Sequence, residues 1–227
     1  MIDILSEYGD DLFAAFWMTI QLAVWSALGS LILGTILAIM RVSPVAVLQK
    51  LGAFYVNVAR NTPLTLILVF CSLGALFILE IYLAPRDAPN SLAANAFRWA
   101  IVGLSAYHAS FVCEALRSGV NTVPVGQAEA ARAIGLTFGQ SLSQVILPQA
   151  FRGAIAPLGS VLIALIKNTT VAAVISVPEA AALMRTIVEN ETGSILVFFI
   201  FALGFVILTL PVGVGFTEMS RRLAVKR

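Results

Sequence analysis

Five long apolar stretches divide this chain, with short polar segments between them. The second stretch is interrupted by the polar run Arg60-Asn61-Thr62-Pro63. Stretches of this length predict membrane-spanning helices, because a span needs about 20 apolar residues and lipid forces backbone groups to bond within their own segment. The pattern therefore predicts an all-α transmembrane protein with five spans in a single domain, residues 1–227. The stretches run from about Leu12 to Met40, Leu51 to Leu83, Phe97 to Leu116, Ala154 to Val177 and Ser194 to Phe216.

The composition supports a protein embedded in a lipid bilayer. The chain is 59% hydrophobic and only 11% charged, whereas soluble domains carry about 25% charged residues. Four acidic residues precede or open the first stretch: Asp3, Glu7, Asp10 and Asp11. A cleavable signal peptide needs a basic first region, so we expect the first stretch to remain as a span. A net charge of +2 points to no particular partner, and we expect no nucleic acid.

The distribution of basic residues predicts the orientation in the membrane. Basic residues gather in the first and third connections and after the last stretch, and these three segments alternate onto one side. The positive-inside rule makes that side cytoplasmic. The sequence therefore predicts an N-terminus outside and a C-terminus inside. The basic residues are Arg41 and Lys50, then Arg117, Arg132 and Arg152, then Arg221, Arg222, Lys226 and Arg227.

The connection between the third and fourth stretches, residues 118–153, is long, charged and rich in small residues. It contains Glu129-Ala130-Ala131, Gly135 and Leu147-Pro148. We expect a first helix from Gln127 to Ile134, whose alanines give it a smooth surface that fits a cleft on another protein. Gly135 then permits a turn that a Cβ would strain. An ordinary amphipathic connector is the alternative.

A second helix is expected to follow the turn. Thr137 and Gln140 have the spacing of a capping box, so the helix starts there and runs to about Ile146. Pro148 closes or bends it, since proline removes a donor and clashes with the preceding turn. In the first helix, Glu129 and Arg132 lie three positions apart, so they can pair with each other or with the charges of a partner.

Lys167 lies near the middle of the fourth stretch, where a lysine costs about 2.5–3.5 kcal/mol on insertion scales. It must therefore face a partner, a carbonyl or water. One hypothesis is that it receives the carboxylate of a substrate in a translocation path. The other is a structural tie to Glu114 or to a partner subunit. Asn168, Thr169 and Thr170 can line the same path or bridge helices.

Arg60 lies about ten residues into the second stretch, close to Pro63. Breaks of this kind are tolerated where they face protein or a cavity, so Arg60, Asn61 and Thr62 form either a gate or substrate contact, or a packing kink near the cytoplasmic interface. Glu114 and Arg117 are three positions apart at the end of the third stretch. They form either an ion pair within the helix, or a gate or relay to the connection that follows.

Few residues in this chain could carry other chemistry. Cys71 and Cys113 both lie in apolar stretches, where we expect small buried thiols. We expect His108 to be a hydrogen-bonded interior residue. One histidine cannot build a zinc site, and no phosphate-binding glycine loop is present. We therefore expect no metal, no catalytic residue and no cofactor in this chain, and ATP chemistry must come from another chain.

A set of short motifs, spread over nearly the whole chain, resembles the permease subunits of polar amino-acid ABC importers, within the wider binding-protein-dependent importer class. The usual family glycine is replaced by Asn61, and a family isoleucine by Val145. The motifs are Arg60-Asn61-Thr62-Pro63; Glu114, Arg117 and Gly119; Pro124 and Gly126-Gln127; Glu129-Ala130-Ala131; Gly135-Leu136; Leu147-Pro148-Gln149-Ala150; Pro157-Leu158-Gly159; and Lys167-Asn168-Thr169-Thr170.

The resemblance implies a five-helix type I importer permease whose cytoplasmic loop docks on an ATPase. The docking residues it implies are Glu129, Ala130, Ala131, Gly135, Leu147 and Pro148. It also implies two ATP-binding subunits that hold ATP and Mg, an extracytoplasmic substrate-binding protein, and a second permease subunit that is a paralogue or an identical copy. The location implied is the bacterial inner membrane. The motifs look closest to permeases of glutamate importers, so the implied function is glutamate import by alternating access.

Two other classes of function were considered. A membrane-embedded enzyme needs converging nucleophilic or acid–base groups, and a single histidine with scattered carboxylates argues against one. An ion-driven secondary carrier is usually longer and contains inverted repeats, and it needs no Glu-Ala-Ala loop. Co-purification with an ATPase separates both alternatives from the importer.

Overall fold

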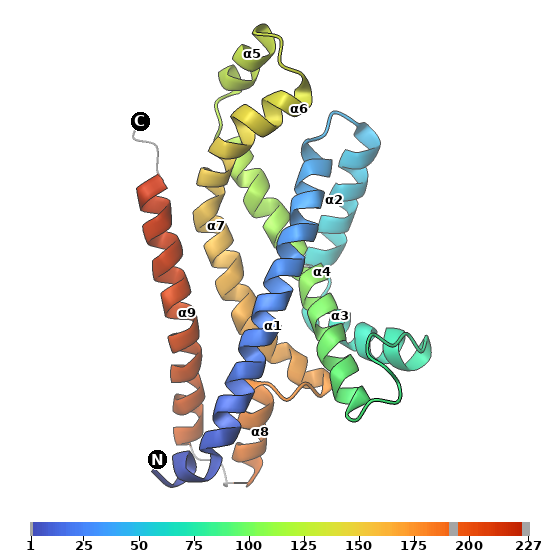
Figure 1. Ribbon diagram of the computed structural model, residues 1–227, viewed down its shortest axis with the longest axis vertical. Helices are drawn as coiled ribbons and strands as arrows, with labels where there is room; N and C mark the ends of the chain where they lie inside the picture. Colours follow the sequence, from blue (N-terminus) through green and yellow to red (C-terminus); the bar gives the residue numbers. More distant parts are fainter. Residues whose placement is uncertain (1, 191–194, 224–227) are drawn as a thin grey trace.

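The computed structural model describes residues 2–190 and 195–223, with side chains from residue 7 onward. In these ranges the regular structure is helical and contains no strand (Figure 1). The predicted all-α fold is therefore confirmed. The elements are α1 (Ile2–Val42), α2 (Ala46–Asn61), α3 (Leu64–Val69), η1 (Phe70–Ile78), α4 (Ser91–Asn121), α5 (Val125–Ala133), α6 (Phe138–Gln140), η2 (Ser141–Ile146), α7 (Leu147–Asn168), η3 (Thr169–Ile175), α8 (Ala180–Asn190) and α9 (Ile195–Leu223).

Helices α1, α4 and α7 form the centre of the molecule. Leu22 of α1 and Leu104 of α4 are fully buried in one apolar cluster, which also takes in η3. A second cluster joins α4 to α7 through Val112 and Ala154. The two backbones meet at Gly119, where a Cβ would overlap the carbonyl oxygen of Ala150. Small residues at such crossings let two helices pack closely. In a membrane this packing matters because no hydrophobic effect drives the helices together.

The second predicted span is broken. α2 ends at Asn61, α3 begins at Leu64, and the pair is bent by 101°. Pro63 lies between them, where it has no N–H to donate and its ring clashes with the preceding turn of a continued helix. Four other helices in the described ranges are long and apolar enough to cross a membrane. The described residues thus contain four helices long enough to cross a membrane, or five spans if the bent pair counts as one.

A short helix that the apolar pattern did not predict lies between η3 and α9. The fourth stretch, predicted to run to Val177, divides into α7 and the 3-10 helix η3, which ends at Ile175 and is followed by Ser176 with φ 64°. α8 then packs against α1 and α9 in a cluster containing Ile187 and Phe201. Its 11 residues are too few to span a membrane. The apolar pattern therefore indicated only a polar connection between two spans. The predicted start of the last stretch, Ser194, lies outside the described residues.

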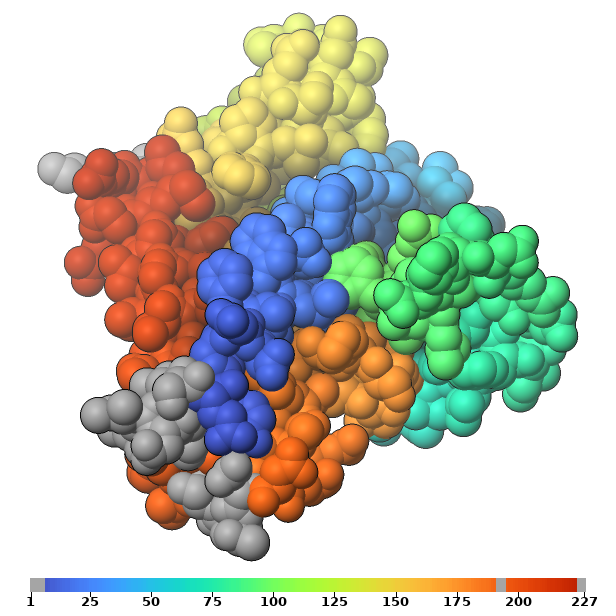
Figure 2. Space-filling model, turned by 60° about the horizontal axis from the view of Figure 1, so that its bottom comes forward, coloured from blue at the N-terminus to red at the C-terminus, as the bar shows by residue number. Residues whose placement is uncertain are grey.

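The two ends of the molecule differ in composition and shape. The α1–α2 connection, the α5–α6 loop and the last turns of α9 lie at one end, and α8 with the start of α1 lies at the other (Figure 1). The connections predicted to be cytoplasmic thus share one end. The yellow α5–α6 segment stands out beyond the long helices in both views (Figures 1 and 2). A projecting loop of this kind is accessible to another protein.

Candidate functional site

Helix α5 forms the outer part of the projecting loop. It begins at Val125, directly after Pro124 and two residues earlier than predicted. Glu129 and Ala130 are exposed, whereas Ala131 is buried. Within the described ranges Glu129 makes no ion pair, so the predicted alternative of a pair with Arg132 is absent in this conformation. An unpaired carboxylate on an alanine-rich helix is available to a partner.

The turn after α5 follows the sequence prediction. Gly135 has φ 85°, in the region that glycine adopts without strain. The backbone N–H of Thr137 donates to Oε1 of Gln140 at 2.9 Å, and the backbone N–H of Gln140 donates to Oγ1 of Thr137 at 3.3 Å. The predicted capping box is therefore confirmed. It fixes the entry to the second helix independently of any partner.

Pro148 does not close the second helix, so that alternative was wrong. The short α6 continues as the π-helical η2, and α7 then begins at Leu147 with Pro148 in its first turn. Proline is tolerated there, because the first N–H groups of a helix have no partner within it. The change to π-helical bonding before Pro148 lets the loop continue directly into the membrane-spanning α7. The loop and the long helix α7 are thus joined without an intervening turn.

Glu114 lies at the centre of charges contributed by three helices. Its carboxylate pairs with Arg41 of α1. It also lies 3.8 Å from guanidinium nitrogens of both Arg60 of α2 and Arg117 of α4. The predicted Glu114–Arg117 pair is therefore present, but Arg41, which the sequence placed only in a basic connection, is the nearest partner. One carboxylate facing three guanidinium groups leaves positive charge in excess.

Arg60 of α2 also contacts an aromatic ring of α4. Its guanidinium carbon lies 5.5 Å from the centroid of the Phe111 ring of α4. The neighbouring side chains bond to their own helix: Nδ2 of Asn61 donates to the carbonyl of Asn57, and Oγ1 of Thr62 to the carbonyl of Val58. These contacts agree with the alternative of a packing kink, in which Arg60 links α2 to α4.

His108 is buried between α4 and α7, as predicted. Its Nδ1 lies 3.0 Å from the carbonyl oxygen of Leu104, and its Nε2 lies 3.1 Å from Nδ2 of Asn168. These contacts fit a neutral ring that donates from Nδ1 and accepts at Nε2, since an amide nitrogen only donates. The contact is a polar bridge between α4 and the end of α7. The helix-bridging role proposed for Asn168 is therefore present.

Lys167 is exposed and makes no tie to Glu114 in this conformation. The hydroxyl of Thr170 donates to the Lys167 carbonyl at 2.8 Å, and that of Thr169 donates to the carbonyl of Ile166 at 2.7 Å. The threonine hydroxyls at the start of η3 therefore bond to the last turn of α7, which directly precedes it, and do not bridge to a neighbouring span. The structure brings together Arg60, Glu114 and Arg117, and separately Asn168 and His108, but it leaves Lys167 unattached.

These features can now be compared with known proteins. Residues 30–224 match the family described as binding-protein-dependent transport system inner membrane component. The chain belongs to this family. It is 52% identical over 228 residues to the glutamate transport system permease protein GluC of Corynebacterium efficiens and to GluC of Corynebacterium glutamicum, covering 100% of each pair of chains. It is 33% identical to the probable glutamine ABC transporter permease protein GlnM of Bacillus subtilis, over 98% of this chain and 96% of that protein.

Solved structures share the fold of this permease. A structure described as an amino acid ABC transporter with histidines matches with a TM-score of 0.82 at 24% identity, over 96% of both chains. The MetNI methionine ABC transporter in an inward-facing conformation matches with a TM-score of 0.79 at 20% identity, over 96% of this chain and 99% of that chain. At this identity the likeness supports the fold alone. The predicted type I importer permease fold is confirmed.

The described part of the permease contains no cluster of histidine, cysteine, aspartate or glutamate that could hold a metal ion. Cys71 and Cys113 are buried free thiols, as predicted. The permease is a multi-pass membrane protein. The polar contacts described above that join its helices are ion pairs and hydrogen bonds. These interactions suit a transport component that changes conformation.

The buried glutamate at the start of α8 was not among the residues predicted from the sequence. Glu179 is 0% exposed, and its carboxylate accepts hydrogen bonds from the backbone N–H groups of Ala181 and Ala182, both at 2.9 Å. Oγ1 of Thr19 accepts from the N–H of Ala180 at 3.1 Å, which ties α8 to α1. Burial raises the pKa of the Glu179 carboxyl from 4.5 to about 7, although the two N–H donors oppose this. An acidic residue after Pro178 was the available signal for a helix start.

Proposed function

We propose that this permease is the transmembrane subunit of an ATP-driven importer that moves glutamate into the cell by alternating access. The observation that carries the proposal is the 52% identity to two glutamate transport permeases over the full length of the chain. The exposed Glu129 and the projecting loop agree with it. The bacterial inner membrane is the proposed location, in keeping with the family description.

The proposed complex contains a second permease subunit, two ATP-binding subunits and an extracytoplasmic substrate-binding protein. Four long helices and one bent pair are few to enclose a path for a polar amino acid, which supports a second permease subunit. A paralogue is the proposed partner, and an identical copy is the alternative. ATP and Mg are assigned to the ATP-binding subunits, and this chain supplies no cofactor site in the proposal.

The proposed coupling runs from the loop to the spans. Closure of the ATP-binding subunits displaces the segment from Glu129-Ala130-Ala131 and Gly135 to Leu147-Pro148. Because η2 continues into α7, the displacement reaches the Asn168–His108 contact at the far end of that helix. The same motion shifts α7 against α4, which it meets closely at Gly119. In the proposal, a shift between these helices is the step from an outward-open to an inward-open state.

The proposed path for the substrate uses the polar residues within the spans. Lys167 is exposed and unpaired, so it is the candidate to receive a substrate carboxylate. Arg60 and Arg117 lie 3.8 Å from Glu114 and are partly exposed, so they are candidates for a gate. The proposed set is completed by polar residues that lie beside these groups in the sequence: Asn61, Thr62, Asn168, Thr169 and Thr170.

The function is tested by uptake of labelled glutamate in cells that express the complete transporter, with Glu129→Lys as the loop variant. We expect the variant to reach the membrane but to lose uptake and co-purification with the ATP-binding subunit. Glu189→Lys is the matched control, because Glu189 is an exposed glutamate at the opposite end of the molecule. Full uptake by the Glu129→Lys variant would contradict the coupling role. Purification without any ATPase would favour a secondary carrier or an enzyme.

A further inference from the structure

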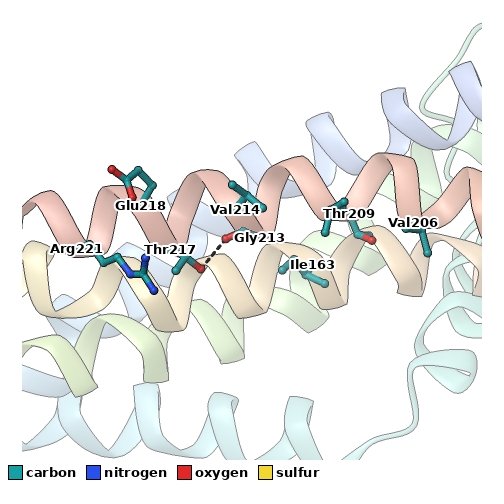
Figure 3. A pocket seen from close by; sticks show the side chains of 9 residues that line it. Ile163, Val206, Thr209, Gly213, Val214, Thr217, Glu218 and Arg221 are labelled. Carbon is teal, nitrogen blue, oxygen red and sulfur yellow. Dashed lines mark hydrogen bonds between the residues drawn. The ribbon is translucent and has the colours of Figure 1, made fainter.

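An open groove runs along α9 where this helix faces α7 (Figure 3). It has a volume of about 620 Å³, which is within the range of small-molecule pockets. Its walls are mostly apolar, and polar groups gather toward the C-terminal end of α9. The hydroxyl of Thr217 is already satisfied, because it donates to the carbonyl of Gly213 at 2.7 Å. The apolar walls include Ile163, Val206, Leu210, Gly213 and Val214.

The groove lies on the least covered of the predicted spans. Only 11% of the most hydrophobic window of α9 is buried within the molecule, against 56% for α4. From Val206 to Arg221 a helix rises about 22 Å at about 1.5 Å per residue. One leaflet of bilayer hydrocarbon is about 15 Å thick, half of the core. If Arg221 lies at the level of the headgroups, a groove of this length extends through one leaflet.

The charged end of the groove is positive. Figure 3 shows the Arg221 side chain directed toward the neighbouring helix and Glu218 pointing to the other side of α9. Glu218 is neutralised by Arg222, whose Nε lies 2.7 Å from its Oε1. Arg221 has no ion-pair partner among residues 7–190 and 195–223. Its guanidinium is therefore available to an anion at the mouth of an apolar groove.

We propose that this groove binds one anionic phospholipid from the leaflet at the C-terminal end of α9, which is the cytoplasmic leaflet in the predicted orientation. One acyl chain lies along the apolar wall past Gly213, and the phosphate receives hydrogen bonds from Arg221. Guanidinium groups bind phosphate through two parallel N–H donors, and a basic residue near an anionic leaflet favours such lipids. An apolar helix of another subunit would fill the groove but leave Arg221 without an anion.

The proposal is tested with the full chain, purified in a neutral detergent and titrated with phosphatidylglycerol or phosphatidylcholine while bound lipid is counted by native mass spectrometry. We expect tighter binding of phosphatidylglycerol, and about a fivefold loss of that affinity in Arg221→Gln. Arg185→Gln is the control, because Arg185 is also an exposed arginine on a helix but lies on α8, away from the groove. It should bind both lipids as the unmodified chain does.

A second variant separates the acyl chain from the headgroup. Val214→Phe places a bulky ring in the groove and should weaken the binding of both lipids to a similar extent. Arg221→Gln should weaken phosphatidylglycerol more than phosphatidylcholine, because the choline cation offsets the charge of the phosphate that Arg221 contacts. Equal affinity for the two lipids in the unmodified chain would overturn the proposal. So would cross-linking of a Leu210→Cys variant to another subunit of the co-expressed complex. Lipid counting requires no transport, so its result is independent of the proposed import function.

Discussion

Replacing Glu179 with glutamine should stabilise the permease at alkaline pH but not at acidic pH. The N–H groups of Ala181 and Ala182 donate to different oxygens of the Glu179 carboxylate. Glutamine has a single acceptor oxygen and no charge, so it can keep one of these two hydrogen bonds. In the folded chain the Glu179 carboxyl is 0% exposed, and burial raises its pKa from 4.5 to about 7. The substitution therefore removes the cost of a buried carboxylate and keeps one of the two hydrogen bonds at the helix start.

The magnitude follows from the difference between the two pKa values. A tenfold difference in acidity corresponds to about 1.4 kcal/mol, so a rise from 4.5 to about 7 corresponds to about 3 kcal/mol. Because the folded-state pKa is the higher one, the favourable contribution is complete below pH 4.5. It falls as pH rises and is lost above about pH 7. Between pH 4 and pH 8 the stability of the glutamine variant relative to the unmodified chain should therefore rise by about 3 kcal/mol.

The assay is unfolding of both proteins in the same detergent at pH 4, 6 and 8. Other carboxylates titrate over this range, but they cancel in the difference between the variant and the unmodified chain. We expect that difference to grow steadily with pH. A difference that is constant with pH, or an unmodified chain that is the more stable at pH 8, would refute the argument that burial of Glu179 opposes its ionisation.

Two further predictions concern the contacts of α4. Gly119→Ala should destabilise the permease by about 1–3 kcal/mol in thermal unfolding, because its Cβ would overlap the backbone of α7; Gly126→Ala, with open space around its Cα, should not. Glu114→Gln should cost about 1.5–3 kcal/mol, because Arg41, whose side chain is only 14% exposed, loses its ionic partner. The exposed pair of Glu80 with Arg86 is the control, and Glu80→Gln should change stability by less than about 1 kcal/mol. Equal effects of variant and control would contradict either prediction.

Local rules were sufficient where a short segment determines its own conformation. The capping box of Thr137 and Gln140 formed as predicted, because its two hydrogen bonds join residues three positions apart. Gly135 took a positive φ for a reason intrinsic to glycine. The break at Pro63 was also predictable, since proline lacks the N–H that a continued helix requires. The angle of 101° at that break was not, because packing against α4 and η3 sets the direction of α3.

The partners of charged residues could not be assigned from spacing. Glu114 and Arg117 were matched because they lie on one helix turn, but the nearest partner, Arg41, is 73 positions away in the chain. Pro148 was expected to close or bend a helix. The structure shows instead that the π-helical η2 before it continues into α7. The burial of Glu179 depends on α1 and α8 meeting at Thr19, which no local pattern records.

The sequence by itself determined that this is a helical membrane protein with a projecting loop, because apolar length and the need to satisfy backbone groups in lipid act within each segment. It also determined the family, through motifs whose residues are close together in the chain. Only the tertiary structure decided which arginines surround Glu114, that Asn168 meets His108, and that the groove beside α9 ends at Arg221. These depend on how separate helices pack, and packing sums many weak contacts between residues that are distant in the sequence.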